Sequence, residues 1–130
     1  MIDIGTGSGI LAIAARLLDA VSAVGLDTDE TALDVARENH TLNGLTPQLI
    51  NGSADCLMDC CADIVVANIN ATVLLSMADE LLRISAPGGR LVLTGFTECE
   101  LAAMEQNFLA STKRIHQSGE WVCVNLGFAA

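Results

Sequence analysis

Apolar residues along this chain alternate between short continuous runs and longer stretches with helical spacing. Short runs of aliphatic residues predict strands, and recurrence at intervals of three and four residues predicts helices. The predicted strands lie at residues 1–4, 21–27, 62–69 and 90–96, and residues 47–54 contain a brief strand that runs into a polar turn. The predicted helices cover residues 10–18, 28–44, 73–82 and 101–108, and the third of them is expected to end at "APGG".

The last predicted strands differ from the others, because no helix separates them. The stretch "KRIHQSGEWVCVNLGF" contains two strands joined near Ser118 and Gly119, and a short turn joins only antiparallel neighbours. The alternation of strands and helices before it predicts an α/β fold: a Rossmann-like, doubly wound, mostly parallel sheet with helices on both faces and a C-terminal antiparallel hairpin. We expect residues 1–130 to form one domain, with the run at 62–69 buried on both faces.

Composition narrows the possible partners. Apolar residues make up 52% of the chain, and the formal net charge is −10, which disfavours direct contact with a nucleic-acid backbone. The five cysteines are odd in number and lack a metal-binding spacing, so we expect neither a disulfide framework nor a metal site. No apolar run approaches the roughly 20 residues of a membrane span, and we expect a cytoplasmic protein with no membrane partner.

The stretch from Asp3 to Gly9, "DIGTGSG", follows the first predicted strand and precedes a helix. Ligands of open α/β sheets bind beyond the carboxyl ends of the strands, and glycines let a ligand approach the backbone closely. A dinucleotide fingerprint requires a glycine where Ile10 stands. The carboxylate of Asp3 is unfavourable beside a pyrophosphate but favourable beside a ligand with an ammonium group and a sulfonium cation. The loop therefore favours S-adenosylmethionine (AdoMet) over NAD.

Two further segments extend this predicted site. Asp27 ends the second strand, where an acidic residue accepts hydrogen bonds from ribose hydroxyls, and Asp29 is the better cap for the next helix. After the third strand, Ser53 and Ala54 are expected to border the adenine ring, and Asp55 to reach its exocyclic amine. For these last residues an ordinary turn is an equal alternative.

With these elements placed, the sequence resembles the class I AdoMet-dependent methyltransferases along nearly its whole length. The resemblance is carried by "DIGTGSGILAIAA", "GLDTDETALDVARENHTLNG", "ADIVVANI", "PGGRLVLTGF" and "GEWVCVNL". This combination is most similar to the ribosomal protein L-eleven methyltransferases (PrmA-type). The resemblance implies AdoMet-dependent methylation of lysine side chains and of the N-terminal amine of a ribosomal protein.

The resemblance also implies roles for single residues. A pocket for the methionine end of AdoMet is formed by Asp3, Gly5, Thr6, Gly7 and Gly9. Asp27 holds the ribose, Ser53 and Ala54 lie near the adenine, and Asn68 faces the transferred methyl group and the acceptor. Asn68 is therefore the predicted catalytic residue and part of the cofactor site.

The residues after Asn68 separate subclasses of methyltransferase. Enzymes that methylate amides and nucleobases share an Asn/Asp-Pro-Pro-aromatic motif here, whereas this chain reads "NINA". The absence of a proline and of a stacking aromatic favours an ordinary amine as acceptor. His40 and His116 are expected to be structural or surface residues, and Trp121 to pack near the hairpin unless it lies close to the acceptor cleft.

Three alternatives remain open at this point. Members of the resembling family carry an N-terminal substrate-recognition domain and a helix before the glycine loop, which we expect this chain to lack. Beside methylation of a ribosomal protein, the alternatives are a methyltransferase for another protein or a small-molecule amine, and a non-catalytic AdoMet-binding fragment. An NAD-linked oxidoreductase is the third alternative, and Ile10 counts against it. Nothing in the sequence indicates an oligomeric state.

Overall fold

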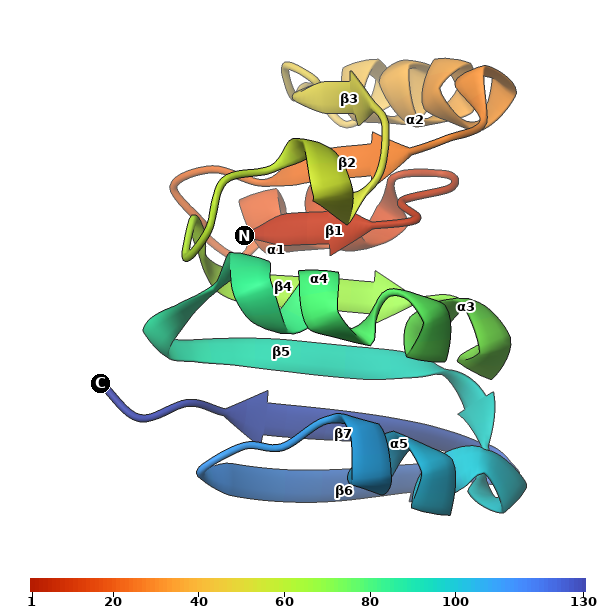
Figure 1. Ribbon diagram of the computed structural model, residues 1–130. Coiled ribbons are helices and arrows are strands. Elements are labelled where there is room, and N and C mark those ends of the chain that lie inside the picture. Colours follow the sequence, from red (N-terminus) through yellow and green to blue (C-terminus); the bar gives the residue numbers. More distant parts are fainter. The chain divides into compact units, whose positions relative to one another are not determined.

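The computed structural model describes residues 1–130, which group into two compact units, Met1–Cys56 and Leu57–Ala130 (Figure 1). Each unit is described by itself. The expectation that the chain forms one domain stays a prediction. No helix is both long enough and apolar enough to cross a membrane.

The first unit is a parallel strand–helix arrangement. Its elements are β1 (Ile2–Ile4), α1 (Ile10–Leu17), β2 (Val24–Asp27), α2 (Glu30–Leu42), β3 (Leu49–Asn51) and a 3-10 turn (Ala54–Cys56). Strand β2 pairs in parallel with β1 on one side and with β3 on the other. Both helices lie behind the strands in Figure 1. The carboxyl ends of the three strands therefore share one edge, from which the glycine loop, Asp27 and the turn after β3 emerge.

The amphipathic pattern of α2 explains how this unit is held together. Leu33 and Ala36 lie on the buried face of α2, whereas Asp34 and Arg37 are exposed and pair with each other. The helix begins at Glu30, just inside the predicted segment 28–44, because the Asp29 side chain accepts a hydrogen bond from the Thr31 amide at 2.9 Å. The prediction that Asp29 is the helix cap is confirmed.

The second unit joins parallel and antiparallel strands. Its elements are β4 (Ala62–Asn68), α3 (Ala71–Ser76), α4 (Ala78–Ile84), β5 (Ser85–Thr97), a 3-10 turn (Glu98–Glu100), α5 (Leu101–Asn107), β6 (Thr112–Ser118) and β7 (Trp121–Gly127). Strand β4 pairs in parallel with β5, and β7 pairs antiparallel with both β5 and β6. The predicted C-terminal hairpin is confirmed. Helices α3, α4 and α5 lie in front of these strands in Figure 1.

Three expectations for the second unit are wrong in detail. The single helix expected at 73–82 is two helices that meet at Met77, where the Ser76 hydroxyl donates to the Val73 carbonyl and competes with helical hydrogen bonding. The helical stretch ends before "APGG", at Ile84, as expected, but the next strand, β5, begins at Ser85 rather than at residue 90, and its pairing with β4 shifts register between Ala62 and Ile64. Strand β4 is not buried on both faces either, because Ile64 is 40% exposed and the helices of this unit lie on one side of its strands.

Candidate cofactor and acceptor sites

The glycine loop joins β1 to α1 and is tied to the neighbouring strand. The Thr6 amide donates to the Leu26 carbonyl at 2.8 Å, and the Gly9 amide donates to the Thr6 carbonyl at 2.9 Å. Gly5, Gly7 and Gly9 all have positive φ angles, and Gly9 at φ 81° is the residue that precedes α1. A side chain at Gly9 is strained by that angle. No side chain caps α1, so its N-terminal end faces the loop without a built-in anion.

Asp3 lies beneath this loop and is only 1% exposed. Its Oδ2 atom accepts a hydrogen bond from the Thr6 hydroxyl at 2.7 Å, whereas its buried Oδ1 atom has no hydrogen-bond partner. Burial, together with the nearby Asp27 carboxylate, raises the pKa of Asp3, and the hydrogen bond from the Thr6 hydroxyl opposes this shift. A buried carboxylate oxygen without a donor is a costly feature, and it makes the loop suited to a cationic ligand rather than to a pyrophosphate.

The raised pKa of Asp3 predicts that this side chain costs stability at neutral pH. The folded state binds a proton on Asp3 more readily than the unfolded state does. The contribution of Asp3 to the free energy of unfolding is therefore highest below 3.8, the pKa of Asp3 in the unfolded chain, and it falls as the pH rises through the folded pKa. The variant Asp3→Asn keeps an acceptor for Thr6. Urea unfolding should show it to be more stable than wild type at pH 7, with a gain that shrinks as the pH is lowered toward 3.8. An equal gain at every pH would contradict this reading.

Asp27 connects the end of β2 to the loop. Its Oδ2 atom accepts from the Gly7 amide at 2.9 Å, and its Oδ1 atom accepts from the Asp29 amide at 3.0 Å. Each carboxylate oxygen has a second lone pair, so the side chain can still accept hydrogen bonds from a diol. The predicted ribose role therefore fits the geometry and stays a prediction.

The turn after β3 lies next to Asp27. The Gly52 amide donates to the Asp27 carbonyl at 2.9 Å, and the 3-10 turn that follows is closed by a bond from the Cys56 amide to the Ser53 carbonyl. Ser53 is half-buried and Ala54 is fully buried, while Asp55 is exposed. Within the first unit the structure thus brings together the loop, Asp27 and this turn. Contact of Ser53 and Ala54 with adenine stays a prediction.

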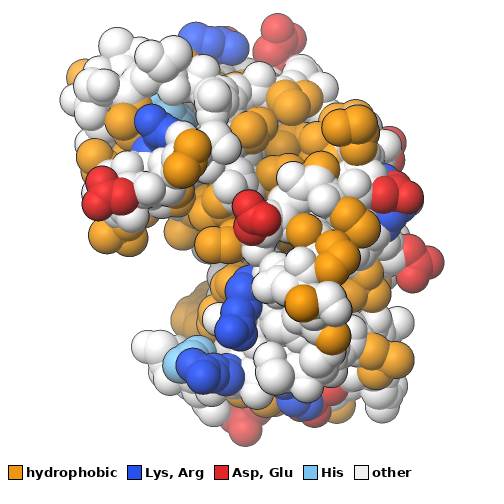
Figure 2. Space-filling view, turned by 90° about the vertical axis from the view of Figure 1, so that its left-hand side faces the viewer, with side chains coloured by type: hydrophobic (Ala, Val, Ile, Leu, Met, Phe, Trp, Pro, Cys, Tyr) orange, Lys and Arg blue, Asp and Glu red, His pale blue; other side chains and the backbone are white.

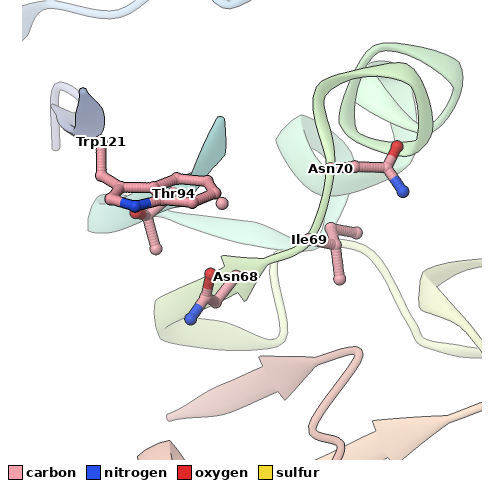
Figure 3. Close-up of a pocket in the computed structure, with 6 residues that line it drawn as sticks. Asn68, Ile69, Asn70, Thr94 and Trp121 are labelled. Atoms are coloured by element: carbon pink, nitrogen blue, oxygen red, sulfur yellow. The ribbon is translucent and has the colours of Figure 1, made fainter. Parts of the chain in front are cut away.

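Asn68 lines a pocket of about 400 Å³ in the second unit, together with Ile69, Asn70, Thr94, Gly95 and Trp121 (Figure 3). Asn68 ends β4 and pairs with Thr94 of β5. Gly95, at φ 90°, passes so close that a Cβ there would lie 2.9 Å from the Asn68 Oδ1 atom and 2.7 Å from the Ile69 carbonyl oxygen. The strand end therefore needs glycine at this position.

The two asparagines of this pocket have different surroundings. The Asn70 Oδ1 atom accepts from the Val73 amide at 3.0 Å and caps α3. Figure 3 shows Asn68 on the side of the pocket where Trp121 lies, whereas Asn70 lies at the start of α3. Trp121 is 55% exposed, so its ring is available at the pocket. Asn68 is thus the asparagine whose amide is not engaged by a helix.

Sequence reasoning missed Thr94 and Gly95, and it placed Trp121 mainly in hairpin packing. The antiparallel pairing of β7 with β5 sets Trp121 opposite Thr97, near the same strand end. The histidines are also clarified. His116 is exposed on β6 opposite Cys123, whereas His40 is 1% exposed and packs against the glycine loop. His40 is therefore a buried structural residue that contacts the loop, and not a surface residue.

The two units together carry the elements of a class I AdoMet-dependent methyltransferase: a glycine loop after β1, an acidic residue ending β2 and a polar residue ending β4. The family described as ribosomal protein L11 methyltransferase (PrmA) matches residues 1–128. The chain belongs to this family.

Individual relatives agree with this assignment. The ribosomal protein L11 methyltransferase of Nitrosococcus oceani is 44% identical over 108 residues, which cover 83% of this chain and 37% of that protein. The one from Geobacter sulfurreducens is 41% identical over 128 residues, covering 95% of this chain and 42% of the relative. A crystal structure of ribosomal protein L11 methylase from Lactobacillus delbrueckii subsp. bulgaricus superposes with a TM-score of 0.88 at 32% identity, covering 99% of this chain and 69% of that one.

These comparisons confirm the predicted Rossmann-like methyltransferase fold and the predicted family. AdoMet, the cofactor predicted from the glycine loop, is the methyl donor of this enzyme family. The chain spans about two fifths of the length of the two curated relatives, 37% and 42%. The activity, the methyl acceptor and the partners of the whole protein are therefore proposed below and not taken over from these relatives.

Proposed function

We propose that residues 1–130 form the AdoMet-binding domain of a cytoplasmic protein N-methyltransferase, which methylates lysine side chains or the N-terminal amine of a ribosomal protein. The observation that carries this proposal is the bond between the Asp27 carboxylate and the Gly7 amide. It ties the acidic strand end to a loop that reads D-x-G-x-G-x-G. A loop of this form, with an unpaired buried carboxylate oxygen beneath it, suits a cationic ligand with an amino-acid end.

The proposed division of labour follows the residues already described. Asp3, Gly5, Thr6, Gly7 and Gly9 form the methionine-end pocket, and Asp27 accepts hydrogen bonds from the ribose. The turn that carries Ser53 and Ala54 borders the adenine. AdoMet supplies a methyl group activated by a sulfonium cation, and everything else in the reaction depends on how the protein holds the acceptor.

Methyl transfer to an amine is an in-line displacement by a neutral nitrogen, so positioning supplies most of the rate enhancement. The Asn68 Oδ1 atom accepts a hydrogen bond from the acceptor amine and directs the nitrogen lone pair away from itself. No titratable side chain lines the pocket, which leaves the proton of a lysine ammonium to solvent. The face of Trp121 favours an alkylated ammonium group through its π electrons.

The charge of the chain suits a basic acceptor protein. It has 16 acidic and 6 basic residues, and Arg37, Arg83 and Lys113 are already paired with carboxylates. Acidic side chains stand on the surface beside hydrophobic ones in Figure 2. A basic ribosomal protein is attracted by the resulting excess of negative charge, whereas a nucleic-acid backbone is repelled.

The Asn68→Ala variant tests the role proposed for Asn68. Single-turnover transfer from tritium-labelled AdoMet to purified ribosomal protein L11 should slow by roughly 10- to 100-fold, because the amine is no longer oriented. The matched control is Asn70→Ala, which lines the same pocket but only caps α3. That control should lose about 1 kcal/mol of stability and little of the transfer rate.

The outcomes separate the alternatives. Equal rates for the two variants would remove Asn68 from the reaction. Transfer to free lysine or to unrelated proteins, with none to L11, would favour another acceptor. AdoMet binding without any transfer would favour a non-catalytic AdoMet-binding part.

A further inference from the structure

The last turn of α2 touches the glycine loop through two consecutive residues. The Asn39 side-chain amide donates to the Ser8 carbonyl at 2.8 Å. The next residue, His40, lies directly against Gly9, where an added Cβ would be 3.0 Å from the His40 Cε1 atom. Two neighbouring residues of α2 thus contact two neighbouring residues of the loop.

His40 is held in one orientation. Its Nδ1 atom lies 2.8 Å from the Ala36 carbonyl oxygen, which accepts only, so Nδ1 carries a hydrogen. In the neutral ring, Nε2 is then the unprotonated atom, and it is buried without a hydrogen-bond partner. The ring sits where Gly9 offers no side chain. The Nε2 atom makes no hydrogen bond that would account for the burial of the His40 ring. The packing of the ring against Gly9 does account for it.

The end of α2 that carries these two residues is itself fixed. The Asn43 side-chain amide donates to the Asn39 carbonyl at 2.8 Å, and the Leu45 amide donates to the His40 carbonyl at 2.9 Å. Asn39 and His40 therefore contact the loop from a helix end that is fixed by its own hydrogen bonds.

The loop is anchored at Thr6, at Gly7 and at the pair Ser8 and Gly9. Thr6 is bonded to Asp3 and to the Leu26 carbonyl, and Gly7 is bonded to Asp27. Ser8 and Gly9 contact no strand in this way, and α2 supplies their anchor. These last two residues form the turn that leads into α1, on the side expected to receive the methionine end of AdoMet.

We propose that Asn39 and His40 are positioning residues for cofactor binding, which hold Ser8 and Gly9 in the conformation that accepts the amino-acid end of AdoMet. This inference rests on the proposed function, because it takes the glycine loop to be the AdoMet site. Neither side chain touches the ligand. Asn39 acts through the Ser8 carbonyl, and His40 acts by filling the space beneath Gly9.

The test uses two ligands that differ only in the part recognised. S-adenosylhomocysteine contains the amino-acid end, whereas 5′-methylthioadenosine lacks it. Isothermal titration calorimetry of the full chain should show that Asn39→Ala weakens S-adenosylhomocysteine binding about three- to tenfold, as the loss of one hydrogen bond predicts, and changes methylthioadenosine binding by less than about twofold. Asn39→Asp should weaken S-adenosylhomocysteine binding further, because the new carboxylate faces the Ser8 carbonyl oxygen.

The matched control is Thr41→Ala. Thr41 lies in the same turn of α2 and donates to the Arg37 carbonyl, with no bond to the loop. It should leave both affinities unchanged. His40→Ala is expected to reproduce the selective loss, and its unfolding midpoint in urea is measured alongside because removal of a buried ring opens a cavity.

Each result bears on the proposal. A selective loss for Asn39→Ala supports it. Unchanged affinity, or an equal loss for both ligands, overturns it and leaves Asn39 with a purely structural role. Failure of the wild-type chain to bind either ligand is a different result, because it would overturn the proposed function itself.

Discussion

The Asp27→Ala variant should bind AdoMet roughly a hundredfold more weakly than the wild-type chain, a loss of about 3 kcal/mol. The carboxylate is expected to accept the ribose hydroxyls, and it already holds the Gly7 amide at 2.9 Å. Its removal deletes charged hydrogen bonds to the ligand and also releases the middle of the glycine loop. Calorimetric titration with AdoMet measures the change directly.

Asp29→Ala is the matched control for this prediction. Asp29 lies two residues further along and uses its side chain to cap α2 through the Thr31 amide. Its replacement should cost about 1 kcal/mol of folding stability and change AdoMet affinity by no more than about twofold. Similar losses of affinity in the two variants would mean that Asp27 acts only by supporting the local fold.

The Gly95→Ala variant should lose roughly 2–5 kcal/mol of folding stability. Gly95 has a φ of 90°, and a Cβ there would lie 2.7 Å from the Ile69 carbonyl oxygen and 2.8 Å from the Ile69 nitrogen. Both are backbone atoms of the segment that follows Asn68, so the strand end and the pocket must shift together. Urea unfolding followed by the fluorescence of Trp121, the single tryptophan, reports on this unit.

Gly119→Ala separates backbone strain from crowding. Gly119 also has a positive φ, 61°, but a Cβ there would have nothing within 4 Å. It should cost only the roughly 1–2 kcal/mol of the left-handed conformation. If both variants unfolded at the same urea concentration, the close approach of Gly95 to Ile69 would have no energetic consequence.

Local sequence signals predicted those parts of the fold that depend on nearby residues. The helix beginning after Asp29 and the hairpin around Gly119 are specified by a capping side chain and by a short turn. The loop from Asp3 to Gly9 was predictable for the same reason, because its glycine spacing reflects a local backbone requirement. The preference for AdoMet followed from this loop, whereas the class of protein followed from a resemblance along nearly the whole chain.

One feature that the sequence did not reveal depends on a local side-chain hydrogen bond, and the others depend on residues far apart in the chain. The helix break at Met77 lies within a continuous apolar pattern. That pattern gives no sign of the hydrogen bond from the Ser76 hydroxyl to the Val73 carbonyl. The position of Trp121 at the Asn68 pocket depends on the register of β7 against β5, which no periodicity encodes. His40 has the spacing of an ordinary helical residue, and only the structure shows it against Gly9.

The central claim is that the glycine loop binds AdoMet rather than a dinucleotide. Its most direct test is calorimetric titration of the folded chain with AdoMet and, separately, with NAD. We predict binding of AdoMet with a dissociation constant on the order of micromolar and no detectable binding of NAD. A folded chain that binds NAD, or that does not bind AdoMet, would contradict the account.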